Sequence, residues 1–357
     1  MCTLSGWLKV AGRQVLGLVH ASRSEKMASY LHDGSDSGYI LSHVQPRPAD
    51  LQPHLSEVLC DMTSPIVQRA DRQYRSNDVK TQYVEVDKVR YAYRELGAAD
   101  GSNGIPLVFL HRFRGTLDDW DPAFVDAVAE YRHVILFSDA AVGSSTGTAA
   151  TTVDAKAANA AAFIRALGHS SVDVLGFSMG GFVAQALALD EPDLVRSAVL
   201  VGSGPGGNAE TDPHTDLVFE IALKPEYALE DVRYLFFAPG RDAETKAYMD
   251  RNAVRREREP IVVPETVQAM AGLIMDFMGG KTDHYERLGQ LIQPVLIVSG
   301  DSDNFFPAKN QWLLYRELPN AQLAMYPQAG HGPHQQHPRE VASQVHRFLD
   351  VQDRTQA

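Results

Sequence analysis

The sequence predicts an α/β protein with a mostly parallel central sheet and helices on both of its faces. Two observations support this. Short, nearly continuous apolar runs are typical of strands covered on both faces, and helical patterns separate these runs along the chain. Alternating strands and helices form parallel sheets with right-handed crossovers. The apolar runs are residues 106–110, 133–137, 172–175, 198–201 and 294–298.

The first 80 residues have a different character. They contain scattered serine, aspartate and histidine, a proline pair at Pro46 and Pro48, and no sustained helical or strand period. We expect residues 1–80 to form a disordered or irregular extension. One interpretation places the natural start at Met62. Another is a weak targeting segment, because basic residues outnumber acidic ones among the first 31 positions.

From residue 81 onward each element has its own signal. Val84 and Val86, then Val89, Tyr91 and Tyr93, alternate on either side of a turn at 87–88, which predicts an antiparallel hairpin. Helices are indicated by an alanine-rich stretch that starts with a threonine, by an apolar stretch with small residues, and by two stretches that begin with proline. These are residues 152–167, 179–189, 307–318 and 338–349.

About 90 residues without a strand signal separate the runs that end near 203 and begin at 294. We expect a helical cap over 209–285, inserted into an α/β core of 81–208 and 286–350. Its apolar clusters are either ordinary core or the lining of a pocket, for which Phe237 and Met275 are candidates. The charge run 255–259 is interpreted as a solvated helix face.

Composition excludes several classes of protein. The chain has 357 residues, with 44% hydrophobic and 22% charged, which excludes a wholly disordered or fibrous chain. A net charge of −12 argues against binding nucleic acid through phosphates. No apolar run approaches the roughly 18 residues that span a bilayer, and 15–19 is too short for a signal-peptide core, so we expect a cytoplasmic protein. Two cysteines, Cys2 and Cys60, are too few for a disulfide scaffold or thiolate metal site.

The central chemical signal is Gly176-Phe177-Ser178-Met179-Gly180-Gly181. The string follows a buried strand and precedes an apolar helix, the setting that holds a serine on a sharp elbow. Glycines are needed there because side chains would clash where the backbone turns tightly. The helix that starts at Met179 directs its N–H groups toward developing negative charge.

On these residues the chain resembles the α/β-hydrolase fold family over about residues 81–350. The family order is nucleophile, acid, histidine, so the resemblance implies that Ser178 is the nucleophile. Residues 300–303 look like the family's Gly-x-x-Asp turn, which makes Asp303 the acid and Asp301 the fallback. Residues 330–332 match its late Gly-His dipeptide, which makes His331 the base. His331 would take the serine proton while Asp303 fixes its tautomer.

The resemblance also implies an oxyanion hole from the backbone N–H groups of Phe113 and Met179. Here Arg112 replaces an expected glycine, and His111 is expected to shape the loop at the substrate site. Arg112 and Arg114 either guide an acidic substrate or form surface salt bridges with aspartates at 118, 119 and 121. Residues 113–122 resemble a generic subgroup of bacterial and fungal hydrolases.

Three further patterns bear on the structure and function. In residues 139–145, Val142 and Ser144 stand where relatives carry glycines, a structural departure that the turn should tolerate. The histidines at 331, 334 and 337 recur every three residues, but the adjacent glycine and prolines disfavour a helix, so no metal site is expected. The glycine-rich stretch 202–207 lacks the lysine of a P-loop.

The sequence therefore predicts a serine hydrolase that cleaves a small or medium apolar carboxylic ester or lactone through an acyl-enzyme on Ser178, without a cofactor. The elbow also resembles cofactor-free haloperoxidases, which are perhydrolases, and hydrolases that cleave carbon–carbon bonds. A ligand-sensing receptor of the same fold with slow turnover is a further alternative. The expected partner is a small-molecule substrate, not nucleic acid or a membrane, and a homodimer is left open.

Overall fold

The structure, a computed structural model, describes residues 7–10, 13–16, 75–97, 104–208, 210–214 and 216–356. The chain divides into two units, Met1–Ala70 and Asp71–Ala357. In the first unit β1 (Trp7–Val10) pairs antiparallel with β2 (Arg13–Leu16), where the sequence predicted no regular element. The other predictions for the extension, including a start at Met62, lie outside the described residues, except at 75–80.

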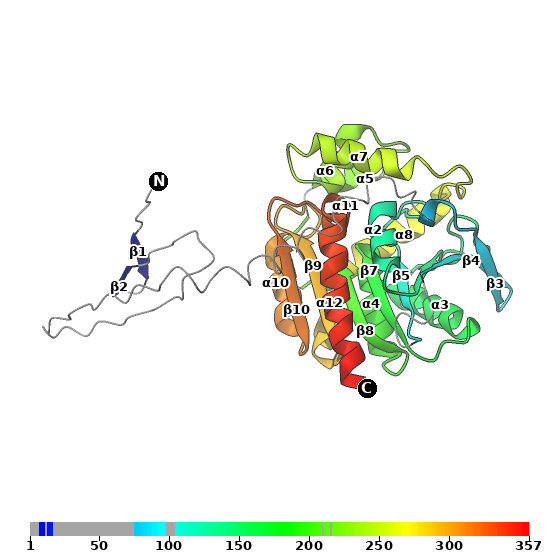
Figure 1. Ribbon diagram of the computed structural model, residues 1–357, viewed down its shortest axis with the longest axis horizontal. Helices are drawn as coiled ribbons and strands as arrows, with labels where there is room; N and C mark the ends of the chain where they lie inside the picture. The colour runs from blue at the N-terminus through cyan, green and yellow to red at the C-terminus, as the bar shows by residue number, and fades with distance from the viewer. Residues whose placement is uncertain are drawn as a thin grey trace, which may run out of the picture. The chain divides into compact units, whose positions relative to one another are not determined.

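An eight-stranded sheet organises the second unit, in the order β10-β9-β8-β7-β5-β6-β4-β3 (Figure 1). Its edge is the predicted hairpin, whose turn residues Asp87 and Lys88 have φ values of 47° and 71°. β4 also pairs antiparallel with β6, and the remaining neighbours are parallel, which confirms the predicted fold class. The strands are β3 (Gln82–Val86), β4 (Val89–Leu96), β5 (Leu107–Leu110), β6 (Val134–Phe137), β7 (Val172–Phe177), β8 (Val195–Val201), β9 (Val295–Gly300) and β10 (Ala321–Tyr326).

Helices cover both faces of this sheet, so every residue of β5 to β9 is buried. Alternate residues of β5 enter the two separate cores, with Phe109 in one and Val108 in the other. The Phe109 side is covered by α2 (Pro122–Ala129) and α12 (Pro338–Gln356). The Val108 side is covered by α3 (Val153–Ala166), α4 (Met179–Asp190) and α10 (Ala308–Glu317).

Helix starts follow the expected capping chemistry. Thr152 Oγ1 accepts a hydrogen bond of 3.1 Å from the backbone N–H of Ala155 at the start of α3. Asp121 caps α2 in the same way, ahead of a proline at the first helical position. None of the described helices is long and apolar enough to cross a membrane.

The insertion between β8 and β9 is helical in its described part, as predicted. It contains α5 (Asp216–Ala222), α6 (Leu229–Phe236), α7 (Asp242–Asn252), α8 (Pro264–Met278), α9 (His284–Arg287) and the 3₁₀ helix η2 (Leu288–Gln290). Figure 1 shows α5, α6 and α7 together at one end of the sheet, next to α11 (Pro333–Gln336). This is the end at which the parallel strands finish.

The charge run at 255–259 corrects the sequence interpretation, because it is a loop and not a solvated helix face. Arg255 is buried and donates hydrogen bonds to the backbone carbonyls of Ser76, Asn77 and Val79. The carboxylate of Glu259 accepts hydrogen bonds from backbone N–H groups of the core. Residues 75–80, assigned from sequence to the extension, are thereby attached to the second unit.

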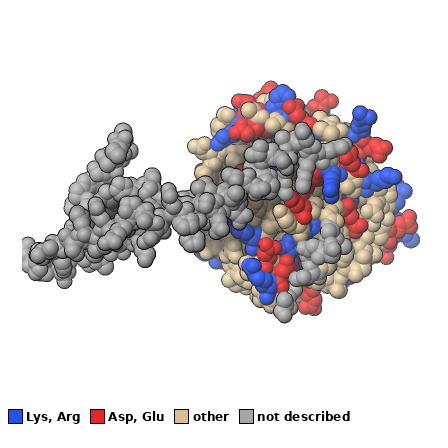
Figure 2. All heavy atoms as spheres, viewed as in Figure 1, with Lys and Arg blue, Asp and Glu red and all other residues tan. Residues whose placement is uncertain are grey.

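Two smaller features also follow from the structure. In the turn 139–145 the positive φ values belong to Ala141 (61°) and Gly143 (55°), so Val142 and Ser144 need no glycine conformation. Figure 2 shows lysine and arginine side chains interspersed with aspartate and glutamate on the viewed face. On the part of that face that is formed by described residues, no continuous basic surface is visible.

Candidate active site

Ser178 lies at the sharp turn between β7 and α4, with φ 56° and ψ −120°. This conformation is strained for a residue with a side chain. The turn is so tight that a Cβ atom on Gly176 would lie 2.2 Å from the carbonyl oxygen of Gly180. A Cβ atom on Gly180 would lie 2.0 Å from the carbonyl oxygen of Leu110. The predicted elbow is therefore present, and its two glycines allow the close approach of three backbone segments.

Asp303 and His331 come together from the ends of β9 and β10. The Nδ1 atom of His331 lies 3.0 Å from Oδ2 of Asp303, and both side chains are at most 1% exposed. The other carboxylate oxygen, Oδ1, accepts backbone hydrogen bonds from Phe305 at 2.7 Å and Phe306 at 3.0 Å. Asp301, the fallback acid, is exposed, and its carboxylate accepts a hydrogen bond from Ser302. The geometry thus pairs His331 with Asp303.

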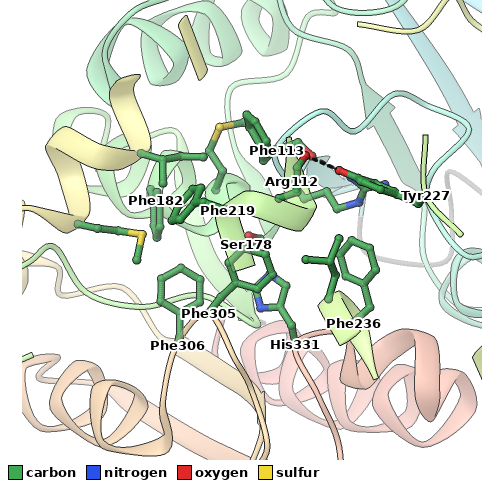
Figure 3. A pocket seen from close by; sticks show the side chains of 15 residues that line it. Arg112, Phe113, Ser178, Phe182, Phe219, Tyr227, Phe236, Phe305, Phe306 and His331 are labelled. Carbon is green, nitrogen blue, oxygen red and sulfur yellow. Dashed lines mark hydrogen bonds between the residues drawn. The ribbon is translucent and has the colours of Figure 1, made fainter. Parts of the chain in front are cut away.

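A pocket with an empty volume of about 460 Å³ joins Ser178 and His331 to both predicted oxyanion residues, Phe113 and Met179 (Figure 3). Its polar lining side chains are Arg112, Ser178, Tyr227 and His331. The remaining wall is apolar: Phe182, Phe219, Ala222, Leu235, Phe236, Ile274, Met278, Phe305 and Phe306. Phenylalanine rings also surround His331, with Phe305 centred 4.3 Å and Phe177 5.1 Å from the His331 ring. This site can bind an apolar molecule beside a serine and a histidine.

The substitution of arginine for glycine at 112 does not disturb this loop. Within 111–121, all of which is described, the positive φ belongs to Arg114 (57°) and not to Arg112. Position 112 therefore needs no glycine conformation. Arg112 Nη1 donates a 2.8 Å hydrogen bond to the backbone carbonyl of Phe113, and its guanidinium lies 5.0 Å from the centre of the Phe236 ring.

Arg112 also forms an ion pair of 3.1 Å with Asp119, so the salt-bridge interpretation is correct for this residue, although the pair is not on the surface. Burial disfavours the charged carboxylate of Asp119, but the adjacent Arg112 and hydrogen bonds from Thr116 outweigh it and keep the pKa of Asp119 below its usual value. Arg114 does not line the pocket and contacts the insertion instead.

Three predicted substrate-binding residues lie outside this pocket. Phe237 is buried against Tyr248, while its neighbour Phe236 lines the pocket. Met275 is 48% exposed, because the pocket-facing side of α8 carries Ile274 and Met278.

The third, His111, packs against Trp120, with the ring centres 4.6 Å apart and the rings tilted, and lines a neighbouring cavity. Burial lowers the pKa of His111 to about 3, so its ring is neutral. Sequence reasoning missed Tyr227, Phe305 and Phe306. For the last two a signal existed, since they directly follow the turn that carries Asp303.

The histidines at 334 and 337 do not join His331. His334 is buried between Phe177 and Phe124, at ring distances of 4.4 and 5.1 Å, and burial lowers its pKa well below the usual value. His337 stacks on Tyr326. Within the described part of the chain no group of three or more potential metal ligands occurs.

Comparisons with known proteins agree with this geometry. A sequence model described as the alpha/beta hydrolase family matches residues 107–344. A solved alpha/beta hydrolase fold protein from Chitinophaga pinensis is 35% identical, with a TM-score of 0.71, and the match covers 77% of this chain and 98% of that one.

Two curated relatives come from Cupriavidus. The dihydrolipoyllysine-residue acetyltransferase component of the acetoin cleaving system of C. necator is 31% identical over 70% of this chain and 64% of its own length. The 2-hydroxy-6-oxononadienedioate/2-hydroxy-6-oxononatrienedioate hydrolase of C. pinatubonensis is 29% identical over 50% of this chain and 62% of its own. The chain thus spans less than two thirds of either relative.

Proposed function

The chain belongs to the alpha/beta hydrolase family, and from this premise we propose that it is a serine hydrolase acting on a small or medium apolar carboxylic ester or lactone. The observation that carries the proposal is the buried Asp303–His331 hydrogen bond of 3.0 Å beside a pocket that Ser178 shares. A serine on an elbow, a histidine and a carboxylate that orients the histidine form the constellation that activates a serine nucleophile.

In the proposed reaction His331 Nε2 takes the proton of Ser178 Oγ as this oxygen attacks the substrate carbonyl carbon. The carbonyl oxygen becomes an oxyanion, which the backbone N–H groups of Phe113 and Met179 stabilise. When the tetrahedral intermediate collapses, the bond to the leaving alcohol breaks and His331 returns the proton to it. Water, deprotonated by His331, then attacks the acyl-enzyme. As the second tetrahedral intermediate collapses, the acid leaves and His331 returns the proton to Ser178 Oγ.

Substrate polarity follows from the pocket wall. Most of the pocket lining is aromatic or aliphatic, as is typical of sites that bind small molecules. Seven lining residues come from the insertion, so we propose that residues 209–285 act as a lid that supplies one wall of the pocket. An apolar acyl group of medium size gains most from burial in such a pocket.

A second candidate is the hydrolysis of a carbon–carbon bond, supported by the relative named as a 2-hydroxy-6-oxononadienedioate/2-hydroxy-6-oxononatrienedioate hydrolase. The same serine and histidine would serve, and the guanidinium of Arg112 in the pocket wall is available to polar groups of such a substrate. The ester proposal is preferred because the remaining wall is apolar and Arg112 is already paired with Asp119.

A substrate panel on the purified protein tests these candidates. Chromogenic esters of increasing acyl length, lactones, a ring-fission dienoate and a peracid-formation assay should be compared for wild type and Ser178→Ala. We expect sustained ester turnover that falls by several orders of magnitude in Ser178→Ala, with little change in melting temperature. Near-normal hydrolysis by the variant would exclude the assignment of Ser178. A single slow acylation per chain would favour a sensor.

A further inference from the structure

Arg114 connects the loop of the candidate oxyanion hole to the insertion. Its Nη1 atom donates hydrogen bonds to the carbonyl oxygens of Ala222 at 2.8 Å and Lys224 at 2.6 Å, and its Nη2 atom reaches that of Pro225 at 3.3 Å. Nη1 also lies 3.2 Å from the hydroxyl of Tyr227, and the guanidinium lies 5.2 Å from the centre of that ring. Arg114 thus binds backbone carbonyls at the end of α5 and in the turn that precedes α6.

These partners depend on a single conformation of the turn. Three backbone carbonyls converge on one guanidinium, and among the ion pairs of the described residues none involves Arg114. A carboxylate side chain could move together with an arginine side chain. The three backbone carbonyls, in contrast, point to one place only while residues 222–225 keep their conformation. Cationic side chains at helix C-termini are favourable partners for such carbonyls. Arg114 therefore binds the turn in the conformation in which Phe219, Ala222 and Tyr227 line the pocket.

The backbone of Arg114 is strained, with φ at 57° in a residue that carries a side chain. It directly follows Phe113, whose N–H is the proposed oxyanion donor. On the other side of Phe113, Arg112 holds the Phe113 carbonyl at 2.8 Å and is itself paired with Asp119. Figure 3 shows Phe113, Arg112 and Tyr227 on one side of the pocket. Phe113 is thus flanked by one arginine fixed to the core and another fixed to the insertion.

We propose that Arg114 is a positioning residue through which the insertion sets the orientation of the Phe113 N–H. The inference rests on the proposed function, because the Phe113 N–H is an oxyanion donor only in the proposed reaction. With the turn at 222–227 in place, Arg114 keeps its left-handed backbone, and the N–H of Gly115 stays hydrogen-bonded at 3.1 Å to the carbonyl oxygen of Arg112, which belongs to the peptide that carries the Phe113 N–H. When the turn moves away, Arg114 loses its carbonyl partners, the 112–115 turn loosens, and this peptide is free to rotate. Closure of the pocket and completion of the oxyanion hole become one event.

Kinetics of three Arg114 variants test the proposal. Arg114→Ala removes the guanidinium, Arg114→Gly also removes it but accepts the positive φ without strain, and Arg114→Lys keeps the charge without the planar fork. Arg241→Ala is the matched control, because Arg241 also joins the insertion to the core, by a 3.0 Å hydrogen bond to Gln328 far along the chain from Phe113. Each is compared with wild type on p-nitrophenyl acetate and p-nitrophenyl hexanoate.

We expect kcat to fall by about tenfold or more for both esters in Arg114→Ala and Arg114→Gly, because a displaced oxyanion donor costs transition-state stabilisation. KM for the acetate should change by less than about twofold, since a two-carbon acyl group gains little from the wall at 219–227. Arg114→Lys should recover part of kcat, and Arg241→Ala should match wild type. Unchanged kcat with KM raised for the hexanoate alone would overturn the proposal. Wild-type activity in Arg114→Gly with reduced activity in Arg114→Ala would also overturn it. The loss of activity would then come from backbone strain at position 114 and not from the missing guanidinium.

Hydrogen–deuterium exchange gives a readout that does not depend on ester turnover. The N–H groups of Gly115, Thr116 and Leu117 are hydrogen-bonded in the structure and should exchange slowly. In Arg114→Ala we expect faster exchange both there and in residues 219–228, and no change at either segment in Arg241→Ala. Faster exchange confined to 219–228 would overturn the coupling. If wild type hydrolysed no ester but both segments loosened together, the proposed function would fail while the coupling stood.

Discussion

Replacing Asp303 with asparagine is the most discriminating test of the site, because the structure determines how the new amide must sit. Oδ1 of Asp303 accepts backbone N–H groups from Phe305 and Phe306, so the amide oxygen of asparagine should occupy this position. The amide NH₂ group then faces Nδ1 of His331, 3.0 Å away in the wild type. Nδ1 can no longer donate and must accept, which leaves the ring proton on Nε2. His331 in that tautomer cannot take the proton of Ser178.

The size of the effect follows from the charge that is lost. In the transition state His331 is an imidazolium beside a carboxylate, and their nearest atoms are 3.0 Å apart. Two unit charges at this distance interact by about 5.5 kcal/mol at an effective dielectric constant of about 20. Since about 1.4 kcal/mol corresponds to a factor of ten in rate, kcat/KM should fall by about 10⁴-fold.

The assay is steady-state hydrolysis of a chromogenic ester, with Asp301→Asn as the matched control on the same turn. Asp301 is exposed, so its replacement should change kcat/KM by less than about threefold. Circular dichroism and a melting curve should show both variants folded. A loss below tenfold in Asp303→Asn, or a larger loss in Asp301→Asn, would refute the assignment of the acid.

Two further predictions concern stability and the extension. His334→Phe should flatten the pH dependence of unfolding. Burial holds the pKa of His334 well below its unfolded value of about 6.5. The resulting contribution to the free energy of unfolding is therefore fully present above about pH 6.5 and is lost as the pH falls below that value. Between pH 7.5 and 5, urea titrations should show a smaller loss of unfolding free energy in the variant than in the wild type, and equal losses would contradict the reasoning. A chain starting at Met62 should keep kcat/KM within about twofold and its melting temperature within about 2 °C. It retains residues 75–80 and every residue of the candidate site, so aggregation or inactivity would show that earlier residues are needed.

The sheet and the positions of the candidate site residues at its strand ends were predictable because their signals are local. A strand buried on both faces must be apolar at nearly every position, which identified β5 to β9 without knowledge of their neighbours. The elbow is fixed by two glycines within five residues, and the acid and histidine each follow a strand directly. The choice of Asp303 over Asp301 came from the family spacing, and the structure pairs Asp303 with His331.

The pocket wall was less predictable because it depends on how the insertion packs. The apolar clusters were found, but which side of each helix faces the pocket is a tertiary property. On α6 a shift of one residue separates Phe236, in the wall, from Phe237 beside Tyr248. On α8 Ile274 faces the pocket while the adjacent Met275 faces solvent. Sequence gives the period of a helix, whereas its rotation about the axis is set by the surface on which it packs.

The arginine at position 112 and the charge run at 255–259 looked unrelated in the sequence, yet both belong to one set of ion pairs around the loop that carries Phe113. Three aspartates of this loop pair with arginines from different elements. The pairs are Asp118 with Arg94 and Arg255, Asp119 with Arg112, and Asp121 with Arg251. Removing one partner from a buried pair typically costs about 3–5 kcal/mol, because the other charge remains without compensation. Such costs restrain the loop in one geometry, and oxyanion donors are effective when fixed before the reaction begins. Arg112 and the charge run are therefore consistent with a preorganised site. Two of its ion pairs, Asp118–Arg255 and Asp121–Arg251, join residues more than 100 positions apart.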